Sequence, residues 1–293
     1  MAKKKQHQPP LNIEQQIENL KTEKGLVIED DAAAKAFLND VSYFRLIKAY
    51  SLTLKPKNGQ YHEGVTFNEL KNLYLFNSDL RHLIFPQIEK VEINLRCRVG
   101  NYISYKYGVS GYRNASHFQN PDFHSTFIDA LDKEINRNKR SPFVRNFQTT
   151  YEGGELPFYA AVELASFGVL SMFFKNLINE DKRNIAKDYD VKYTYLESWF
   201  ENISFVRNVC AHYGRLYNAK LPKTPTLYKE YRDSGIGNHR LFATILCLKH
   251  LLPDDYHWEK FVDELAKLIS VYPDADCSTM GFPENWETVL INR

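Results

Sequence analysis

The sequence predicts an all-α protein. Apolar residues recur at steps of three and four along most of the 293 residues, no stretch alternates helix with strand, and no internal repeat is present. A hydrophobic content of 43% is enough for a substantial core in one large domain or two modest ones. We therefore expect a helical bundle that carries further helices at both ends.

The N-terminal part predicts a disordered basic tail and then short helices. The tail covers residues 1–10, and the helices are expected at Ile13–Leu20, Asp31–Leu38 and Tyr43–Tyr50. Asn58-Gly59 is a tight-turn signal, so residues 51–66 form either a small hairpin or a simple loop.

A long helical pattern follows from Thr66, which has the capping-box spacing with Glu69. Its apolar positions continue to about Gly108, and Pro86 falls inside them. Because proline removes a backbone donor, the pattern describes either one long helix or two helices joined near Pro86.

The rest of the chain predicts more helices. An apolar central helix, opened by Leu156-Pro157, is expected from Tyr159 to Leu177, and another helix runs from Tyr193 to about Tyr213. A Lys/Pro/Tyr/Gly-rich linker leads to a helical pair, Arg240–Leu252 and Tyr256–Tyr272. The expected domains are a main domain over 11–220 and a C-terminal extension over 221–293 packed on it.

Composition narrows the function. Lys+Arg 38 against Asp+Glu 36 excludes a polycation, so any nucleic acid must bind at a local patch. The 4 cysteines are far apart and are expected to be reduced. With no membrane-length apolar run and no apolar segment behind the basic N-terminus, we expect a cytoplasmic protein without a membrane partner.

The segment 207–218 is the best candidate site. The segment lies at the end of a helix whose apolar stripe includes Trp199 and Val206. It contains a dense group of polar residues, namely Arg207, Asn208, His212, Arg215 and Asn218. Arginine binds phosphate in a planar fork and histidine moves protons near neutral pH. The pattern is therefore suited to a phosphodiester, although such groups can also simply cap a helix end.

Helical geometry separates the two most important residues. Asn208, His212 and Arg215 share one helix face, whereas Arg207 lies about 140° from His212 on an ideal helix. Either the helix breaks near His212, as Gly214 suggests, or a two-fold partner completes the site. Arg232 and His239 have a similar spacing but lie in a glycine-containing loop and are a weaker candidate.

Metal-free RNA cleavage needs an acid, a base and a cation that stabilises the charged phosphorane. Here His212 would transfer protons, Arg207 would bind the phosphate and Asn208 would orient either group, leaving a 2′,3′-cyclic phosphate and a 5′-hydroxyl. Because the sequence has no phosphate-binding glycine loop and no His/Cys cluster at zinc spacing, we expect neither cofactor nor metal.

Other residues could extend an RNA-binding surface. The densest basic cluster lies within 123–147, which is either a solvated helix face or an RNA-facing surface. The many aromatic residues either pack in the core or include surface tyrosines that stack on unpaired bases, and we expect Tyr213, beside the motif histidine, to contact RNA. The basic cluster within 123–147 consists of Arg137, Lys139, Arg140 and Arg145.

Several segments together resemble the abortive-infection (Abi) protein family of the AbiD/AbiF type, within the HEPN superfamily. The similarity covers roughly residues 12–290. The segments are Ser42–Leu46, Phe67–Arg81, Ile88–Arg96, Leu156–Gly168, Arg207–Asn218 and Met280–Trp286.

The resemblance implies a HEPN-like helical bundle with an Arg-x4-His ribonuclease motif, here Arg207 and His212. It also implies phage defence by RNA cleavage, a composite site across a homodimer and, as in some members, restraint by a small non-coding RNA. The chain departs from many members at Tyr213, where they have a second histidine, and at Tyr217, where they have tryptophan.

Three hypotheses follow, in order of preference. The first is a metal-independent endoribonuclease of an abortive-infection or toxin–antitoxin system, with RNA as substrate. The second is a protein that binds structured RNA through the same surface without cutting it. The third is a helical scaffold whose motif residues seal a dimer interface.

Overall fold

A computed structural model describes residues 9–56, 59–252 and 256–292. Across these residues the protein is all-α, as predicted, with two isolated β-bridges and no strand. The helices belong to two compact units, Met1–Leu80 with Lys267–Asp276 and Arg81–Ala266 with Cys277–Arg293. The predicted domain boundary at residue 220 lies inside the second unit and stays a prediction. Most of the predicted basic tail, residues 1–8, lies outside the described residues.

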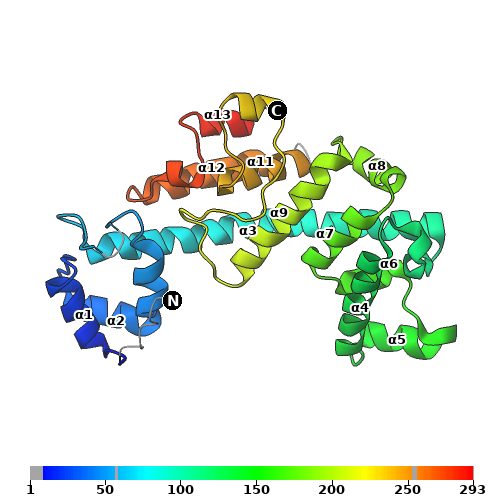
Figure 1. Cartoon of the computed structure of the whole chain (residues 1–293), viewed down its shortest axis with the longest axis horizontal. Coiled ribbons are helices and arrows are strands. Elements are labelled where there is room, and N and C mark those ends of the chain that lie inside the picture. The colour runs from blue at the N-terminus through cyan, green and yellow to red at the C-terminus, as the bar shows by residue number, and fades with distance from the viewer. Residues whose placement is uncertain (1–8, 57–58, 253–255, 293) are drawn as a thin grey trace, which may run out of the picture. The chain divides into compact units, whose positions relative to one another are not determined.

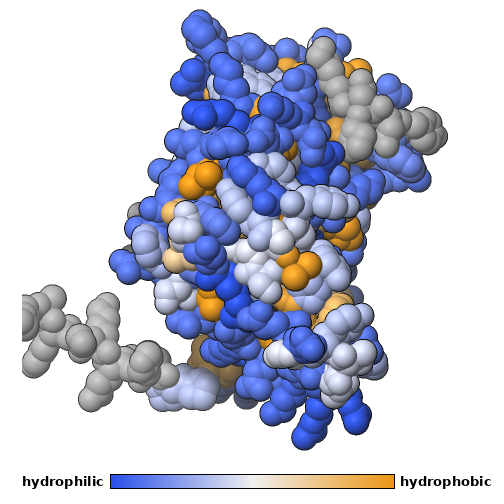
Figure 2. Space-filling view, turned by 90° about the vertical axis from the view of Figure 1, so that its right-hand side faces the viewer, coloured by the Kyte–Doolittle hydropathy of each residue, from blue (hydrophilic) through white to orange (hydrophobic). Residues whose placement is uncertain are grey.

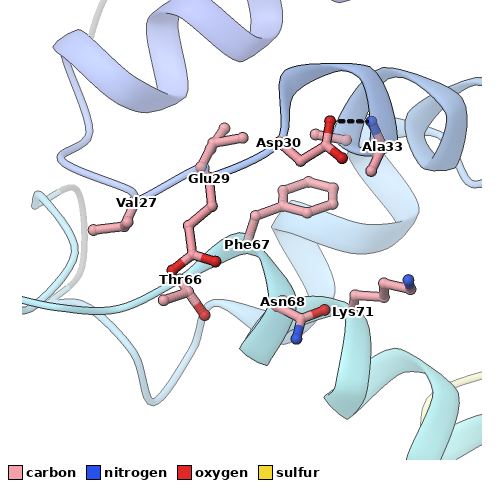
Figure 3. A pocket seen from close by; sticks show the side chains of 10 residues that line it. Val27, Glu29, Asp30, Ala33, Thr66, Phe67, Asn68 and Lys71 are labelled. Atoms are coloured by element: carbon pink, nitrogen blue, oxygen red, sulfur yellow. Dashed lines mark hydrogen bonds between the residues drawn. The ribbon is translucent and has the colours of Figure 1, made fainter.

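The first unit begins with α1 (Ile13–Thr22) and α2 (Asp31–Asp40), which pack on each other. The third predicted helix contains a π-helical turn, η1 (Phe44–Lys48). Between Ser51 and Thr66 the described residues form turns without a strand, which is the loop alternative; Lys57 and Asn58 lie outside the description. This unit contains a hollow of about 250 Å³. Figure 3 shows side chains that line it, among them Asp30, whose carboxylate accepts the Ala33 N–H and caps α2.

The long helix α3 (Phe67–Tyr107) is one continuous helix that contains Pro86, so the single-helix alternative is confirmed. Its start is the predicted capping box: the Glu69 N–H donates to Thr66 Oγ1 at 3.1 Å, and the Thr66 N–H donates to Glu69 Oε1 at 3.3 Å. The boundary between the two compact units falls within this helix.

The second unit contains the rest of α3 and most of the remaining helices (Figure 1). α7 packs against both α9 and α4, and rings such as Phe158, Phe173 and Phe200 are fully buried there. Its helices up to residue 211 are η2 (Gly111–Arg113), η3 (Ala115–His117), α4 (Pro121–Arg137), α5 (Pro142–Thr150), η4 (Glu152–Gly154), α6 (Phe158–Ala161), η5 (Val162–Leu164), α7 (Phe167–Asn176), α8 (Asn179–Lys187) and α9 (Tyr193–Ala211).

The predicted continuous helix from Tyr159 to Leu177 is wrong. The chain forms α6 and η5, becomes extended at Ala165 and Ser166, and starts α7 in a direction bent by 109°. The break has a local cause, because Ser166 Oγ accepts the Val169 N–H at 3.3 Å and caps a new helix. Within the described ranges, no single helix is long and apolar enough to cross a bilayer. The two arms of this bent pair reach that length and composition only when they are taken together.

The C-terminal part contains the two predicted helices, observed as α11 (Leu241–Leu251) and α12 (Tyr256–Val271). α11 packs on α9. Three shorter helices were not predicted: α10 (Lys229–Asp233), η6 (Cys277–Met280) and α13 (Trp286–Ile291). The buried Lys249 ammonium donates to the Val289 carbonyl at 2.6 Å, which ties the end of the chain to α11.

The face drawn in Figure 2 is mainly hydrophilic, with small and separate apolar patches. The exposed apolar side chains therefore do not by themselves outline one large contact area on that face.

We expect Thr66→Ala to lower the free energy of unfolding by about 1 kcal/mol, because the change removes the N-terminal cap of α3. Urea denaturation followed by circular dichroism would measure the change. Thr53→Ala, an exposed threonine in the preceding turn, is the matched control and should stay within about 0.5 kcal/mol of wild type. Equal stability of wild type and Thr66→Ala would contradict the role of the cap.

Candidate functional site: the end of helix α9

Helix α9 is fixed in the core by the predicted apolar stripe. Leu196, Trp199, Ile203, Val206 and Cys210 are all buried. Burial raises the pKa of the Cys210 thiol to about 12, so this thiol stays protonated and acts as an apolar group near neutral pH. The stripe therefore positions the polar residues that follow it.

The end of α9 is a Schellman motif centred on His212. His212 is the C-cap residue, the Tyr213 N–H donates to the Cys210 carbonyl at 3.2 Å, and the Gly214 N–H donates to the Val209 carbonyl at 2.7 Å. The predicted break near His212 is therefore confirmed. The His212 N–H still donates to the Asn208 carbonyl at 3.0 Å, so the backbone leaves the helix at Tyr213, directly after His212.

The left-handed position of this motif belongs to Tyr213, not to the glycine. Tyr213 has φ 57°, a conformation that costs a non-glycine residue on the order of 1 kcal/mol. Gly214 is required for space: a Cβ there would lie 2.8 Å from Val209 Cγ1 and 3.0 Å from the Val209 carbonyl oxygen. The helix end thus keeps an aromatic residue at a position where glycine would be relaxed.

Arg207 is held by a carboxylate of α3. Arg207 Nε donates to Glu92 Oε2 at 3.1 Å, while the second oxygen of Glu92 accepts from Arg96 at 2.7 Å. Arg96 also donates to the Ala165 carbonyl at 2.6 Å. The Glu92 side chain is only 8% exposed, whereas that of Arg207 is 32% exposed. The buried carboxylate thus anchors a guanidinium that still reaches solvent.

Arg207 also lines a charged hollow of about 510 Å³. Arg137, from the basic cluster at the end of α4, lines the same hollow, so the structure brings these two predicted residues together. Lys133 adds positive charge, and Glu134 and Glu163 add negative charge. The hollow therefore presents cations to a ligand, with carboxylates on its walls.

The structure does not place His212 in that hollow. His212 and Asn208 are exposed, and no described residue forms a side-chain hydrogen bond with either. Both side chains therefore reach solvent. The completion of the site by a two-fold partner, expected from the helix geometry, stays a prediction.

Arg215 and Asn218 shape the loop after α9. Arg215 Nη1 donates to the Tyr217 carbonyl at 3.0 Å, and Asn218 Oδ1 accepts from Arg240 at 3.2 Å. Asn218 has φ 47°, a conformation that asparagine tolerates better than most residues. These contacts give both side chains a structural role, and their predicted contact with RNA stays a prediction.

The remaining basic residues are exposed. Arg137 forms an ion pair with Glu134, Lys139 and Arg140 lie between α4 and α5, and Arg145 lies on α5. The weaker candidates Arg232 and His239 are both exposed; Arg232 lies in the short helix α10, which corrects the predicted loop there, and His239 lies in the loop before α11. Among the residues that the structure describes, no group of three or more His, Cys, Asp or Glu side chains could hold a metal ion.

Sequence patterns missed the α3 side of the site. Glu92 and Arg96 follow each other at i, i+4 on an otherwise apolar helix face, a spacing that indicates an ion pair. Arg81 is 5% exposed, and its Nη1 donates to the Gly214 carbonyl at 3.1 Å. Charged residues within the apolar pattern of α3 indicate that these side chains are paired. The spacing does not show that their partners lie on α9.

Comparison with known proteins shows the family. The family model described as Abi-like protein matches residues 36–218, which include the end of α2 and the whole of α3 and of α9 with its polar end. The chain belongs to the Abi-like protein family. No curated protein and no solved structure matches it.

We expect Glu92→Gln to lower the free energy of unfolding by about 1–3 kcal/mol, because two partly buried guanidinium groups lose their counter-charge. Glu89→Gln is the matched control: Glu89 is an exposed glutamate one turn earlier on α3 and should change stability by less than about 0.5 kcal/mol. Urea denaturation measures both. Equal effects of the two substitutions would show that Glu92 does not anchor Arg207.

Proposed function

We propose that this Abi-like protein is a metal-independent endoribonuclease that acts in abortive infection, the phage-defence response to which its family points. The observation that carries the proposal is the helix end at which a solvent-accessible guanidinium, anchored by Glu92, is followed within two turns by an exposed histidine. An anchored cation and a free imidazole are the groups that RNA cleavage through the 2′-hydroxyl requires.

Arg207 binds the phosphate and stabilises the charge of the phosphorane. His212 serves as acid or base: as a base it takes the proton of the 2′-hydroxyl, and as an acid it gives one to the leaving 5′-oxygen. Asn208, exposed one turn before His212, orients the phosphate or the imidazole by hydrogen bonding. The products are a 2′,3′-cyclic phosphate and a 5′-hydroxyl.

A homodimer would solve the separation of the two catalytic residues. Arg207 faces a hollow that His212 does not line, so one subunit does not offer both groups to the same hollow. A two-fold axis near the end of α9 would bring two Arg/His sets together. We propose such a composite site, of the kind that the HEPN resemblance implies.

The resemblance also supports the biological setting of the proposal. We propose that the protein acts on cellular RNA in the cytoplasm, as the toxin of a toxin–antitoxin system, and that a small non-coding RNA restrains it. The basic cluster would extend the RNA contact beyond the catalytic residues, through Arg137, Lys139, Arg140 and Arg145.

Binding of structured RNA without cleavage is the second candidate. The shared hollow of Arg207 and Arg137 favours it, because two arginines from different helices can hold phosphates whether or not His212 takes part. In that case binding would weaken steeply with salt, and the RNA would be recovered intact.

We expect wild type to cleave total cellular RNA in chelator and His212→Ala to lose about 10²–10⁴-fold in rate, since the proton-transfer group is removed. Mapping of the new ends should give cyclic phosphates and 5′-hydroxyls. His239→Ala, an exposed histidine outside the motif, is the matched control and should cleave like wild type. Cleavage by His212→Ala at the wild-type rate would refute the assigned site; intact RNA bound by both proteins would favour the second candidate.

A further inference from the structure

A third hollow, of about 320 Å³, lies directly beside the motif. One wall comes from α3 and the other from the last residues of α9 and its C-terminal cap. Its volume is at the lower end of the roughly 300–1,000 Å³ that small-molecule pockets have, which suits one small group. The hollow is lined by Arg81, His82, Phe85, Pro86, Cys210, Ala211 and Tyr213.

The walls of this hollow favour a flat apolar group. Phe85, Pro86 and Tyr213 provide ring surfaces. The Arg81 guanidinium is turned to the backbone, because it donates to the Gly214 carbonyl and the residue is only 5% exposed. A ligand here meets mainly carbon faces, with His82 as a further polar lining residue, and bases stack on aromatic side chains in such an environment.

Tyr213 is held at this hollow against its backbone preference. It has φ 57° and is 68% exposed, so its ring gains little from burial while its backbone is strained. Glycine at this position of a Schellman motif would be relaxed. Strain of this kind, next to a candidate catalytic residue, supports a function for the side chain.

The hollow also adjoins the cation that would hold a phosphate. The guanidinium carbon of Arg207 lies 5.9 Å from the centroid of the Phe85 ring, and Phe85 is part of the hollow. Ala211 and Tyr213, which flank His212 in the chain, are part of it too. A nucleotide whose phosphate contacts Arg207 would therefore have this hollow within reach of its own base or a neighbouring one.

We propose that this hollow is a base subsite: it holds an unpaired nucleobase of the RNA, stacked on Tyr213, beside the phosphate bound by Arg207. The inference rests on the proposed function and adds to it the position of a base next to the cleaved bond. Because stacking uses the face that all bases share, the subsite accepts any base and requires an unpaired one.

The test compares two fluorescein-labelled probes by anisotropy, an adenosine 12-mer and the same ribose-phosphate 12-mer without bases. His212→Ala serves as parent so that the RNA stays intact. We expect the added substitution Tyr213→Gly to weaken binding of the adenosine 12-mer roughly 10-fold and to leave the abasic 12-mer unchanged. Tyr213→Phe, which keeps the ring, should bind the adenosine 12-mer like the parent.

A stability measurement separates function from folding. Tyr213→Gly should raise Tm by about 2–4 °C because the backbone strain is relieved, although RNA binding weakens. Asp190→Gly is the matched control, since Asp190 is an exposed residue with φ 51° outside both hollows. It should raise Tm in the same direction without changing the affinity for the adenosine 12-mer.

Several results would overturn the base subsite alone. They are unchanged affinity of Tyr213→Gly for the adenosine 12-mer, equal losses on both probes, and a lower Tm that shows a packing role for the ring. A change of oligomeric state with unchanged affinity would assign Tyr213 to a protein contact and also overturn it. If the parent binds neither probe and wild type leaves cellular RNA intact, the proposed function itself fails.

Discussion

The carboxylate of Glu92 is the contact on which the candidate site depends. It lies in the core, bonds Arg207 with one oxygen and Arg96 with the other, and so joins α3 to α9. A buried carboxylate between two guanidinium groups is favourable only while both partners stay in place. The contact therefore fixes the position of α9 against α3 and, with it, the direction in which Arg207 meets solvent. Arg81 makes a second link, to the Gly214 carbonyl, at the end of the same helix.

The backbone is locally strained between Arg207 and Gly214, the two residues of this helix end that α3 contacts. The close approach of Gly214 to Val209 leaves no room for a side chain, and Tyr213 must adopt a left-handed backbone. Stability alone would favour glycine or asparagine at this position. The motif residue His212 lies inside this strained turn and is exposed rather than packed. This exposure is the physical argument against a purely structural role for the helix end.

Most of the fold could be predicted because helical periodicity and caps are local. The capping box of Thr66 and Glu69 follows from neighbouring residues. For the pattern through Pro86 and for the helix end near His212, the sequence predicts the observed structure as one of two alternatives. The helix expected from Tyr159 to Leu177 failed because its apolar composition continues across the bend, and the cap at Ser166 is a weak signal inside an apolar run. The short helix α13 depends on burial of Leu290 and contacts far along the chain, which a local pattern does not contain.

The site was predictable only on one side. Spacing makes Arg207, Asn208 and His212 candidates because they follow one another on α9. The charged hollow that Arg207 lines does not include His212. Spacing cannot identify Glu92, Arg81 or Phe85 as neighbours, since α3 meets α9 only after both have packed in the core. Those α3 residues shape the candidate site: Glu92 anchors the Arg207 guanidinium, and Phe85 forms an apolar wall beside it. An Arg-x4-His spacing alone is therefore a weak indication of a nuclease. It becomes a chemical hypothesis when a second helix supplies the counter-charge and an aromatic surface.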